Sequence, residues 1–198
     1  MNITAIRQQE RRKDRYAVYV DGTYSFSLNA DTLLAKGLVP GQELDAEQLK
    51  TYLQLATEDK AYGLALAYVA RRMRSRWELE DYFRRKGYTP SLSDVVMKKL
   101  ARLGLVDDAA FAEAWVRNRR LFKPVSRRRL TQELRQKRVA DETIEQTLAE
   151  DDADERTVLR ELIARRRKQT RYQDNQKLMQ YLARQGFNYD DIKSALED

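Results

Sequence analysis

Apolar residues along this chain recur with a long, fixed period. A skeleton of four apolar positions occurs three times, as Leu79, Phe83, Val96 and Leu100, then as Leu130, Leu134, Ile144 and Leu148, and then as Leu178, Leu182, Ile192 and Leu196. Each position of the second copy is separated from its counterpart in the third copy by the same number of residues. From the first copy to the second, the step is longer at the leading pair than at the trailing pair, which predicts a longer loop around positions 89 to 91. A regular period of this kind is typical of stacked modules.

Each copy also contains an earlier helix. Leu64, Tyr68 and Arg72 match Phe111, Trp115 and Arg119, and these match Leu159, Ile163 and Arg167. Residues that favour helix N-caps precede the later helices, at Ser75, Ser126 and Asp174. The pattern predicts a mainly α protein whose three tandem three-helix repeats form a curved, elongated array. We place the repeats at residues 60–107, 108–155 and 156–198.

Residues 1–59 differ in kind and predict a β-hairpin-containing segment with short helices. Asp21-Gly22 between two β-rich runs is a hairpin signal. A pairing of Val20 with Tyr24, Val18 with Phe26 and Tyr16 with Leu28 makes one apolar face and predicts a bulge beside the turn. Short helices are expected at residues 31–36 and from a capping box at residues 45–48 to about Thr57, and the first repeat is expected to open near Asp59.

Composition excludes most familiar site chemistry. The 198 residues include no Cys and no His, which excludes thiolate or Cys/His zinc sites and imidazole bases. The amino-terminal residues lack the apolar core of a signal peptide, and no apolar run approaches bilayer length. We therefore expect a cytoplasmic protein without a membrane segment, cofactor or metal site. We also expect it to be a monomer.

The net charge of +7 predicts a polyanionic partner. Its distribution is uneven: residues 1–60 carry −1, residues 61–107 carry +5, residues 108–149 carry +4 and residues 156–198 carry +4. The run at 150–155, EDDADE, adds −5. Each repeat is thus basic, and an acidic linker separates the last two.

The basic residues gather at the junction between the first and second helices of each repeat. In a stacked array these junctions would lie along one edge, which we call the basic ridge, suited to phosphates or to an acidic protein surface. The structural alternative is that each cluster only stabilises the last carbonyls and the dipole of a helix C-terminus, or forms a solvated face. Its recurrence in three repeats favours binding. The ridge comprises Arg71, Arg72, Arg74, Arg76, Arg117, Arg119, Arg120, Lys123, Arg127, Arg128, Arg129, Arg165, Arg166, Arg167, Lys168 and Arg171.

Aromatic and acidic residues have structural interpretations beside functional ones. Tyr68, Phe83, Phe111 and Trp115 lie on core stripes, so packing explains them better than base stacking. Trp77 and, less clearly, Tyr172 are exceptions. The carboxylate pairs at residues 107–108 and 190–191 could hold Mg²⁺, but each stands where a helix begins, so capping is favoured.

The chain resembles the RecX family of recombinase regulators. The resemblance rests on residues 65–88, 100–119 and 126–139, of which the run GLVDDAAFAEAWVRNR is the most specific. It covers the three repeats and weakens in the third. Arg138 stands where the pattern has Gly, as at Gly87 and Gly186, so this helix end is expected to be capped differently. The β-containing head that precedes the repeats resembles an extension found in some members.

The resemblance implies a modulator, not an enzyme, in DNA repair, homologous recombination and the SOS response. It would bind the RecA filament on single-stranded DNA, lie in its groove and inhibit strand exchange, ATP hydrolysis and co-protease activity. The residues alone predict a basic helical repeat protein for nucleic acid or a nucleoprotein. An autonomous DNA-binding protein with helix-turn-helix-like repeats is the alternative, and a metal-dependent nuclease is a third class.

Overall fold

The computed structural model describes residues 1–197, which form ten α-helices and one three-stranded sheet. The chain divides into two compact units. The first contains residues 1–72 and 82–103, and the second contains residues 73–81 and 104–198, of which residues 73–81 and 104–197 are described. Each unit is considered by itself below.

The head of the first unit is an antiparallel sheet in the order β1-β2-β3, formed by Ile3–Gln8, Arg15–Val20 and Thr23–Asn29. The predicted pairs Val18 with Phe26 and Tyr16 with Leu28 are confirmed, and so is a bulge near the turn. The predicted partner of Val20 is wrong, because Val20 pairs with Thr23. Next to the turn, the strands therefore pair in the register of a two-residue hairpin loop. The pairing shifts by one residue after Tyr19 pairs with Tyr24.

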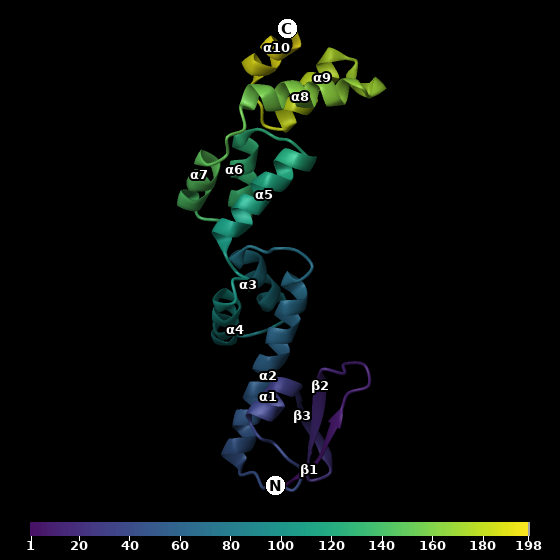
Figure 1. The fold of residues 1–198 in the computed structure, drawn as a ribbon, viewed down its shortest axis with the longest axis vertical. Coiled ribbons are helices and arrows are strands. Elements are labelled where there is room, and N and C mark those ends of the chain that lie inside the picture. The colour runs from purple at the N-terminus through teal and green to yellow at the C-terminus, as the bar shows by residue number, and fades with distance from the viewer. Residues whose placement is uncertain (198) are drawn as a thin grey trace. The chain divides into compact units, whose positions relative to one another are not determined.

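Two helices follow the sheet: α1 (Ala30–Ala35) and α2 (Ala46–Val69). The N-cap of α1 is Asn29, whose side chain accepts from the Thr32 N–H, so the helix begins one residue before the predicted start at residue 31. The head core joins residues of the sheet, the connecting loops and α2 (Figure 1). Its buried members are Ile3, Val18, Val20, Phe26, Leu28, Leu38, Leu44 and Ala56.

The second helix corrects the sequence analysis. The capping box of Asp45 and Gln48 is confirmed, but the helix continues past Thr57 to Val69 with no new start at Asp59. Asp59 is 6% exposed and accepts from the Arg15 guanidinium at 2.8 Å and from the Asn29 N–H at 2.9 Å. A buried carboxylate needs such partners. Asp59 thus anchors the head to α2, and the boundary predicted at residues 59 and 60 falls inside one helix.

Three three-helix repeats follow, as predicted. Their apolar skeleton is buried at every position except Leu196, which is half-buried. In the first repeat, Ala61 and Ala65 are fully buried, whereas Leu64 is only half-buried. The remaining helices are α3 (Arg76–Arg85), α4 (Pro90–Arg102), α5 (Asp108–Phe122), α6 (Arg127–Gln136), α7 (Asp141–Ala149), α8 (Glu155–Arg167), α9 (Asn175–Arg184) and α10 (Tyr189–Glu197), with a 3-10 turn at Thr170–Tyr172.

In the second unit, the second helices of successive repeats are in contact: the start of α3 meets the end of α6, and the start of α6 meets the end of α9. The Ser75 hydroxyl donates to the Lys137 carbonyl at 2.9 Å, where α6 ends. The Ser126 N–H donates to the Gln185 carbonyl at 3.1 Å, where α9 ends. Both serines are fully buried and also cap their own helices. Two of the cap residues read from the sequence, Ser75 and Ser126, therefore also make contacts between repeats.

Arg138 is another correction. Its φ of 58° is left-handed, and the next N–H, on Val139, donates to the Leu134 carbonyl. At the equivalent place after α9, Gly186 has a φ of 90° and the Phe187 N–H donates to the Leu182 carbonyl. Both helices thus end in the same left-handed turn, although arginine carries a steric cost there that glycine does not.

Within residues 1–197, no helix has the length and hydropathy needed to cross a membrane.

Candidate binding surface

The sixteen residues of the predicted ridge lie at three helix junctions. The first cluster divides between the units, with Arg71 and Arg72 in the first and Arg74 and Arg76 in the second. The other two clusters both belong to the second unit, at the α5–α6 and α8–α9 junctions. In the view of Figure 1 the C-terminal ends of α5 and α8 point to the same side of that unit. A ridge continuous over all three junctions stays a prediction.

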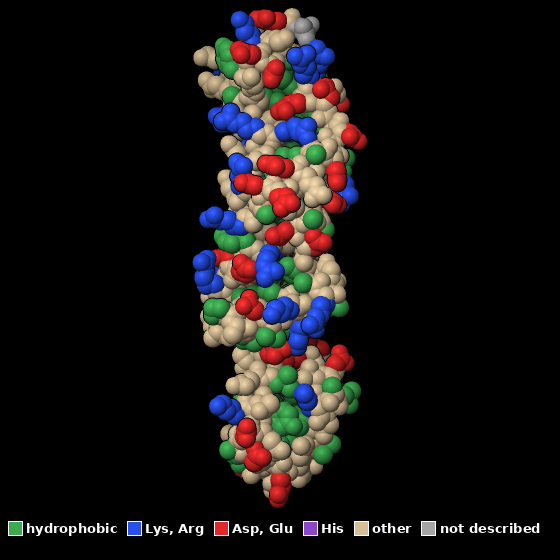
Figure 2. Space-filling view, turned by 90° about the vertical axis from the view of Figure 1, so that its left-hand side faces the viewer, with side chains coloured by type: hydrophobic (Ala, Val, Ile, Leu, Met, Phe, Trp, Pro, Cys, Tyr) green, Lys and Arg blue, Asp and Glu red, His purple; other side chains and the backbone are tan. Residues whose placement is uncertain are grey.

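The exposed charge is mixed rather than uniformly basic. On the face drawn in Figure 2, Lys and Arg side chains are interspersed with Asp and Glu. Which arginines can meet a partner therefore depends on the contacts that each makes within the protein.

Arg120 belongs to the framework of the second unit. Its guanidinium donates to the Asp151 carboxylate, with the shortest hydrogen bonds at 2.6 and 3.1 Å, and to the Val125 carbonyl at 2.8 Å. The side chains of this pair are only 12% and 9% exposed. Arg120 thus holds the loop before α6 against the end of the second repeat. We therefore leave Arg120 out of the candidate surface, because its strong contacts are internal.

Glu133 is a second internal hub. Its carboxylate accepts from the Trp115 indole N–H at 2.9 Å and from Arg119 at 2.7 Å, and it lies 3.4 Å from Arg129. Glu133 is 7% exposed, so burial of the charge is offset by these donors. The Arg119 guanidinium also lies 5.2 Å from the centre of the Trp115 ring. Arg119 and Arg129 therefore serve the packing of the second repeat.

Trp115 also connects with the start of the first repeat's second helix. The Lys137 ammonium lies 5.5 Å from the indole centre and donates to Glu78 at 2.7 Å. Glu78 in turn accepts from the Ser75 N–H at 3.3 Å. Trp115 is thus half-buried and packed against the central core, as the periodicity predicts.

In the third repeat, arginines pack on tyrosines. The Arg166 guanidinium lies 4.6 Å from the Tyr181 ring centre and 5.9 Å from that of Tyr172. Arg171 lies 5.8 Å from Tyr172. Arg167 donates to the Gln173 carbonyl at 2.8 Å and to the Asn175 side chain. These contacts fix the α8–α9 junction and leave less of its charge for a partner.

Three further ridge residues contact the protein itself. Arg76 pairs with Glu80 at 3.0 Å, and its backbone N–H donates to Asp108 at 2.8 Å. Burial raises the pKa of the Asp108 carboxyl, while this hydrogen bond opposes the rise. Arg72 and Arg74 also have partners within the protein.

What remains is a smaller set of exposed cations. Within residues 1–197 these side chains have no ion pair or side-chain hydrogen bond, and all are exposed except Arg127, which is half-buried. We call them the free cation set: Arg71, Arg117, Lys123, Arg127, Arg128, Arg165 and Lys168. Every repeat contributes at least one member.

Packing accounts for Phe83 and Phe111, and capping accounts for Asp107. Phe83 and Phe111 are buried, and Trp77, off the core stripe, is 37% exposed. Asp107 caps α5 by accepting from the Ala109 and Ala110 N–H groups. Within residues 1–197, no group of three or more acidic side chains is placed to hold a metal ion.

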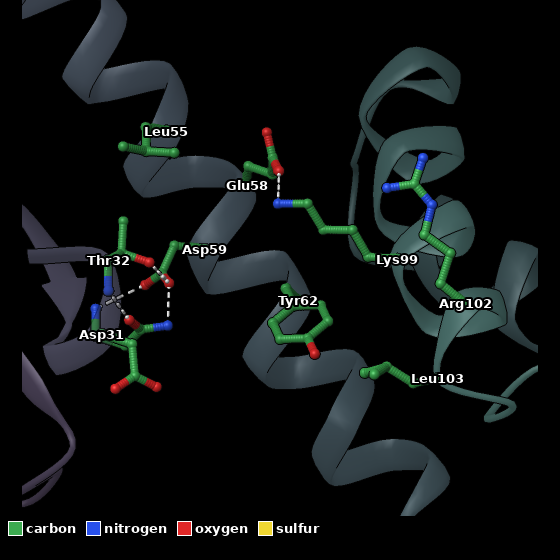
Figure 3. Close-up of a pocket in the computed structure, with 10 residues that line it drawn as sticks. Asp31, Thr32, Leu55, Glu58, Asp59, Tyr62, Lys99, Arg102 and Leu103 are labelled. Carbon is green, nitrogen blue, oxygen red and sulfur yellow. Dashed lines mark hydrogen bonds and ion pairs between the residues drawn. The ribbon is translucent and has the colours of Figure 1, made fainter. Parts of the chain in front are cut away.

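Sequence reasoning missed a hollow of about 410 Å³ in the first unit, between α1, α2 and α4 (Figure 3). Asp59 forms its floor with the hydrogen-bonded Thr32, and Lys99 reaches across to pair with Glu58. The Tyr62 and Leu103 side chains complete its other side. Beside this hollow, the Thr32–Asp59 contact connects α1 with α2, and the Lys99–Glu58 pair connects α4 with α2.

Four family models match the chain. The model of the regulatory protein RecX N-terminal domain matches residues 1–45. Those of the first, second and third RecX three-helix domains match residues 61–100, 107–148 and 154–196.

Relatives and a solved structure agree with these matches. A regulatory protein RecX of Halalkalibacterium halodurans is 35% identical over 150 residues, which are 74% of this chain but only 56% of the relative, so the chain spans little more than half of that protein. One of Geobacillus kaustophilus is 34% identical and covers 99% of this chain and 76% of its own. A crystal structure of regulatory protein RecX superimposes with a TM-score of 0.71 at 26% identity, over 100% of this chain and 99% of that one.

Proposed function

The chain belongs to the RecX family of regulatory proteins, and on that premise we propose that it binds the RecA filament on single-stranded DNA and regulates it. In this proposal it lies in the filament groove across neighbouring subunits and inhibits strand exchange, ATP hydrolysis and co-protease activity. It acts as a cytoplasmic monomer without catalysis of its own.

The observation that carries the proposal is the free cation set. Exposed cations that lack an internal partner can neutralise the phosphates of a polyanion and release its condensed counterions. Arg119 or Arg120 would first have to break contacts inside the protein. The set recurs at the same junction of each repeat. A filament with DNA at its centre offers a repeating target that one compact acidic ligand does not.

The test compares filaments with naked DNA. Arg117, Lys123 and Arg128 are replaced together with Ala, since all three are exposed cations of the second repeat. We expect weaker binding to RecA–single-stranded DNA filaments and less inhibition of ATP hydrolysis. Each lost phosphate contact should reduce the slope of log affinity against log salt by about 0.7. If the lost contacts are to acidic groups of RecA, binding to naked DNA should change little.

A matched control removes the same charge elsewhere. Lys36, Lys50 and Lys98 are exposed and lie outside the junctions, so their replacement with Ala should leave filament binding close to that of the parent. If both triple variants weaken binding equally, only net charge matters. A parent that does not co-sediment with filaments would refute the proposal, and a sequence-specific footprint on bare duplex would favour an autonomous DNA-binding protein.

A further inference from the structure

The last turn of α5 carries two adjacent apolar side chains in water. Leu121 is 61% exposed and Phe122 is 71% exposed, although both end a helix whose opposite face packs in the core. We call this pair the apolar knob. An exposed aromatic beside an exposed aliphatic residue is the kind of feature that marks an interaction surface.

The repeat skeleton does not require the knob. At the equivalent positions of the third repeat, one full period later, stand Gln169 and Thr170. In the first repeat the connection from Arg72 to Ser75 is shorter than the matching connection from Arg119 to Ser126 in the second. The knob is therefore particular to the second repeat and not a by-product of the helical pattern.

The protein holds this helix end firmly. Pro124 and Val125 are buried directly after the knob, and the Val125 carbonyl accepts from Arg120, which is itself paired with Asp151. The Lys123 N–H donates to the Arg119 carbonyl and closes α5. A knob on a braced helix end loses little conformational freedom when it binds.

The segment that carries the knob is basic. Residues 114–132 contain no Asp or Glu, and four members of the free cation set flank the pair in sequence: Arg117, Lys123, Arg127 and Arg128. The carboxylates of Asp151 and Glu133, which contact this segment, are largely buried and paired. Two exposed acidic side chains, Asp154 and Glu161, line a hollow with Arg120 and Pro124 behind this helix end. A complementary partner must therefore offer an apolar recess with an acidic rim.

From the exposure of the pair, the bracing of this helix end and its charge, we infer that the apolar knob inserts into an apolar pocket with an acidic rim on the protein component of the filament. A nucleobase fits less well, because base stacking would use only the ring of Phe122 and leave Leu121 in water. This inference rests on the proposed function and assigns different contacts to the apolar and the basic residues of the second repeat. The knob contacts protein, and the cations beside it meet the acidic rim.

The test replaces Leu121 and Phe122 together with Ala. Loss of an anchor of this kind should weaken binding to RecA–single-stranded DNA filaments by about 30-fold or more. Binding to naked single-stranded DNA should stay unchanged. The salt dependence of filament binding should keep its slope, because no charge is removed.

The control removes apolar side chains of similar exposure from the head, by replacing Leu34 and Val39 with Ala. Filament affinity should then match that of the parent. Circular dichroism and thermal unfolding verify that all variants fold, and a single Phe122→Gln variant repeats the test should the double variant unfold.

Each alternative has a distinct outcome. An equal loss on filaments and on naked DNA would assign the knob to nucleobases and overturn the inference. An unchanged filament affinity would overturn it as well, and so would self-association of the parent that the double variant abolishes. A parent that fails to bind filaments at all would refute the proposed function, and this inference with it.

Discussion

The second and third repeats share one apolar skeleton but stabilise their junctions in different ways. In the second, Glu133 collects the Trp115 indole and two arginines, and Arg120 pairs with Asp151. In the third, the positions that match Glu133, Trp115 and Arg120 hold Tyr181, Ile163 and Lys168, and Arg166 packs on the tyrosine ring. The second repeat thus combines buried ion pairs with cation–aromatic contacts at Trp115, whereas the third packs Arg166 on Tyr181. The skeleton fixes the helices, and the polar positions around it are free to diverge.

The largest expected effect separates Arg120 from Lys168. Replacing Arg120 with Ala leaves the buried Asp151 without its partner and should cost about 3 to 5 kcal/mol of unfolding free energy. Replacing the exposed Lys168 with Ala should change it by less than about 0.5 kcal/mol. Urea unfolding of both variants measures the difference. Equal, small effects would mean that the Arg120 pair does not hold the junction.

An intermediate effect compares the ends of α6 and α9. A Cβ added to Gly186 would overlap the Ser126 hydroxyl oxygen and lie 2.9 Å from Arg129 Cβ, in a backbone with a φ of 90°. Gly186→Ala should therefore cost about 2 kcal/mol or more.

The reverse kind of substitution at Arg138, to Gly, should change the unfolding free energy in the opposite direction. Arg138→Gly relieves a left-handed strain of roughly 1 to 2 kcal/mol and adds roughly 0.5 to 1 kcal/mol of chain entropy cost. A net gain of about 0.5 kcal/mol is expected. Thermal unfolding of the two variants side by side tests the contrast. Destabilisation by Arg138→Gly would show that the arginine side chain contributes more than the strain costs.

The smallest effect concerns Asp108, at the contact of the first and second repeats. Burial raises the pKa of its carboxyl from the ordinary value of 3.8, so the folded state holds its proton more tightly than the unfolded state. Stability from this group is present below the unfolded pKa and is lost as pH rises through the folded pKa. Asp108→Asn keeps an acceptor for the Arg76 N–H and removes the titration. The variant should lose this fall of stability above pH 3.8, measured by urea unfolding between pH 3 and 7. Parallel profiles would contradict this assignment.

The sequence determined the periodic features of the fold. The spacing of Leu130 and Leu134, and of their counterparts, identified the buried positions, and Ser75, Ser126 and Asp174 identified the helix starts. These signals are local, because each depends on a few residues within one or two turns of helix. The hairpin was likewise predictable from Asp21-Gly22 and the alternation around it, apart from the pair next to the turn.

Only the tertiary structure decided how the charged residues are used. Asp59 resembles a helix start in sequence, but it is buried in the middle of α2 because Arg15 and Asn29, distant in sequence, donate to it. The sequence does not distinguish Arg120 from Arg128, since both lie in the same basic cluster. In the structure Arg120 is paired with Asp151 and largely buried, whereas Arg128 is exposed. The apolar skeleton repeats along the chain and can be read from it. Whether a charged side chain is buried and paired or exposed to water depends on the partner that the fold brings within hydrogen-bonding distance. Such partners are often far apart in the chain, so the local sequence does not identify them.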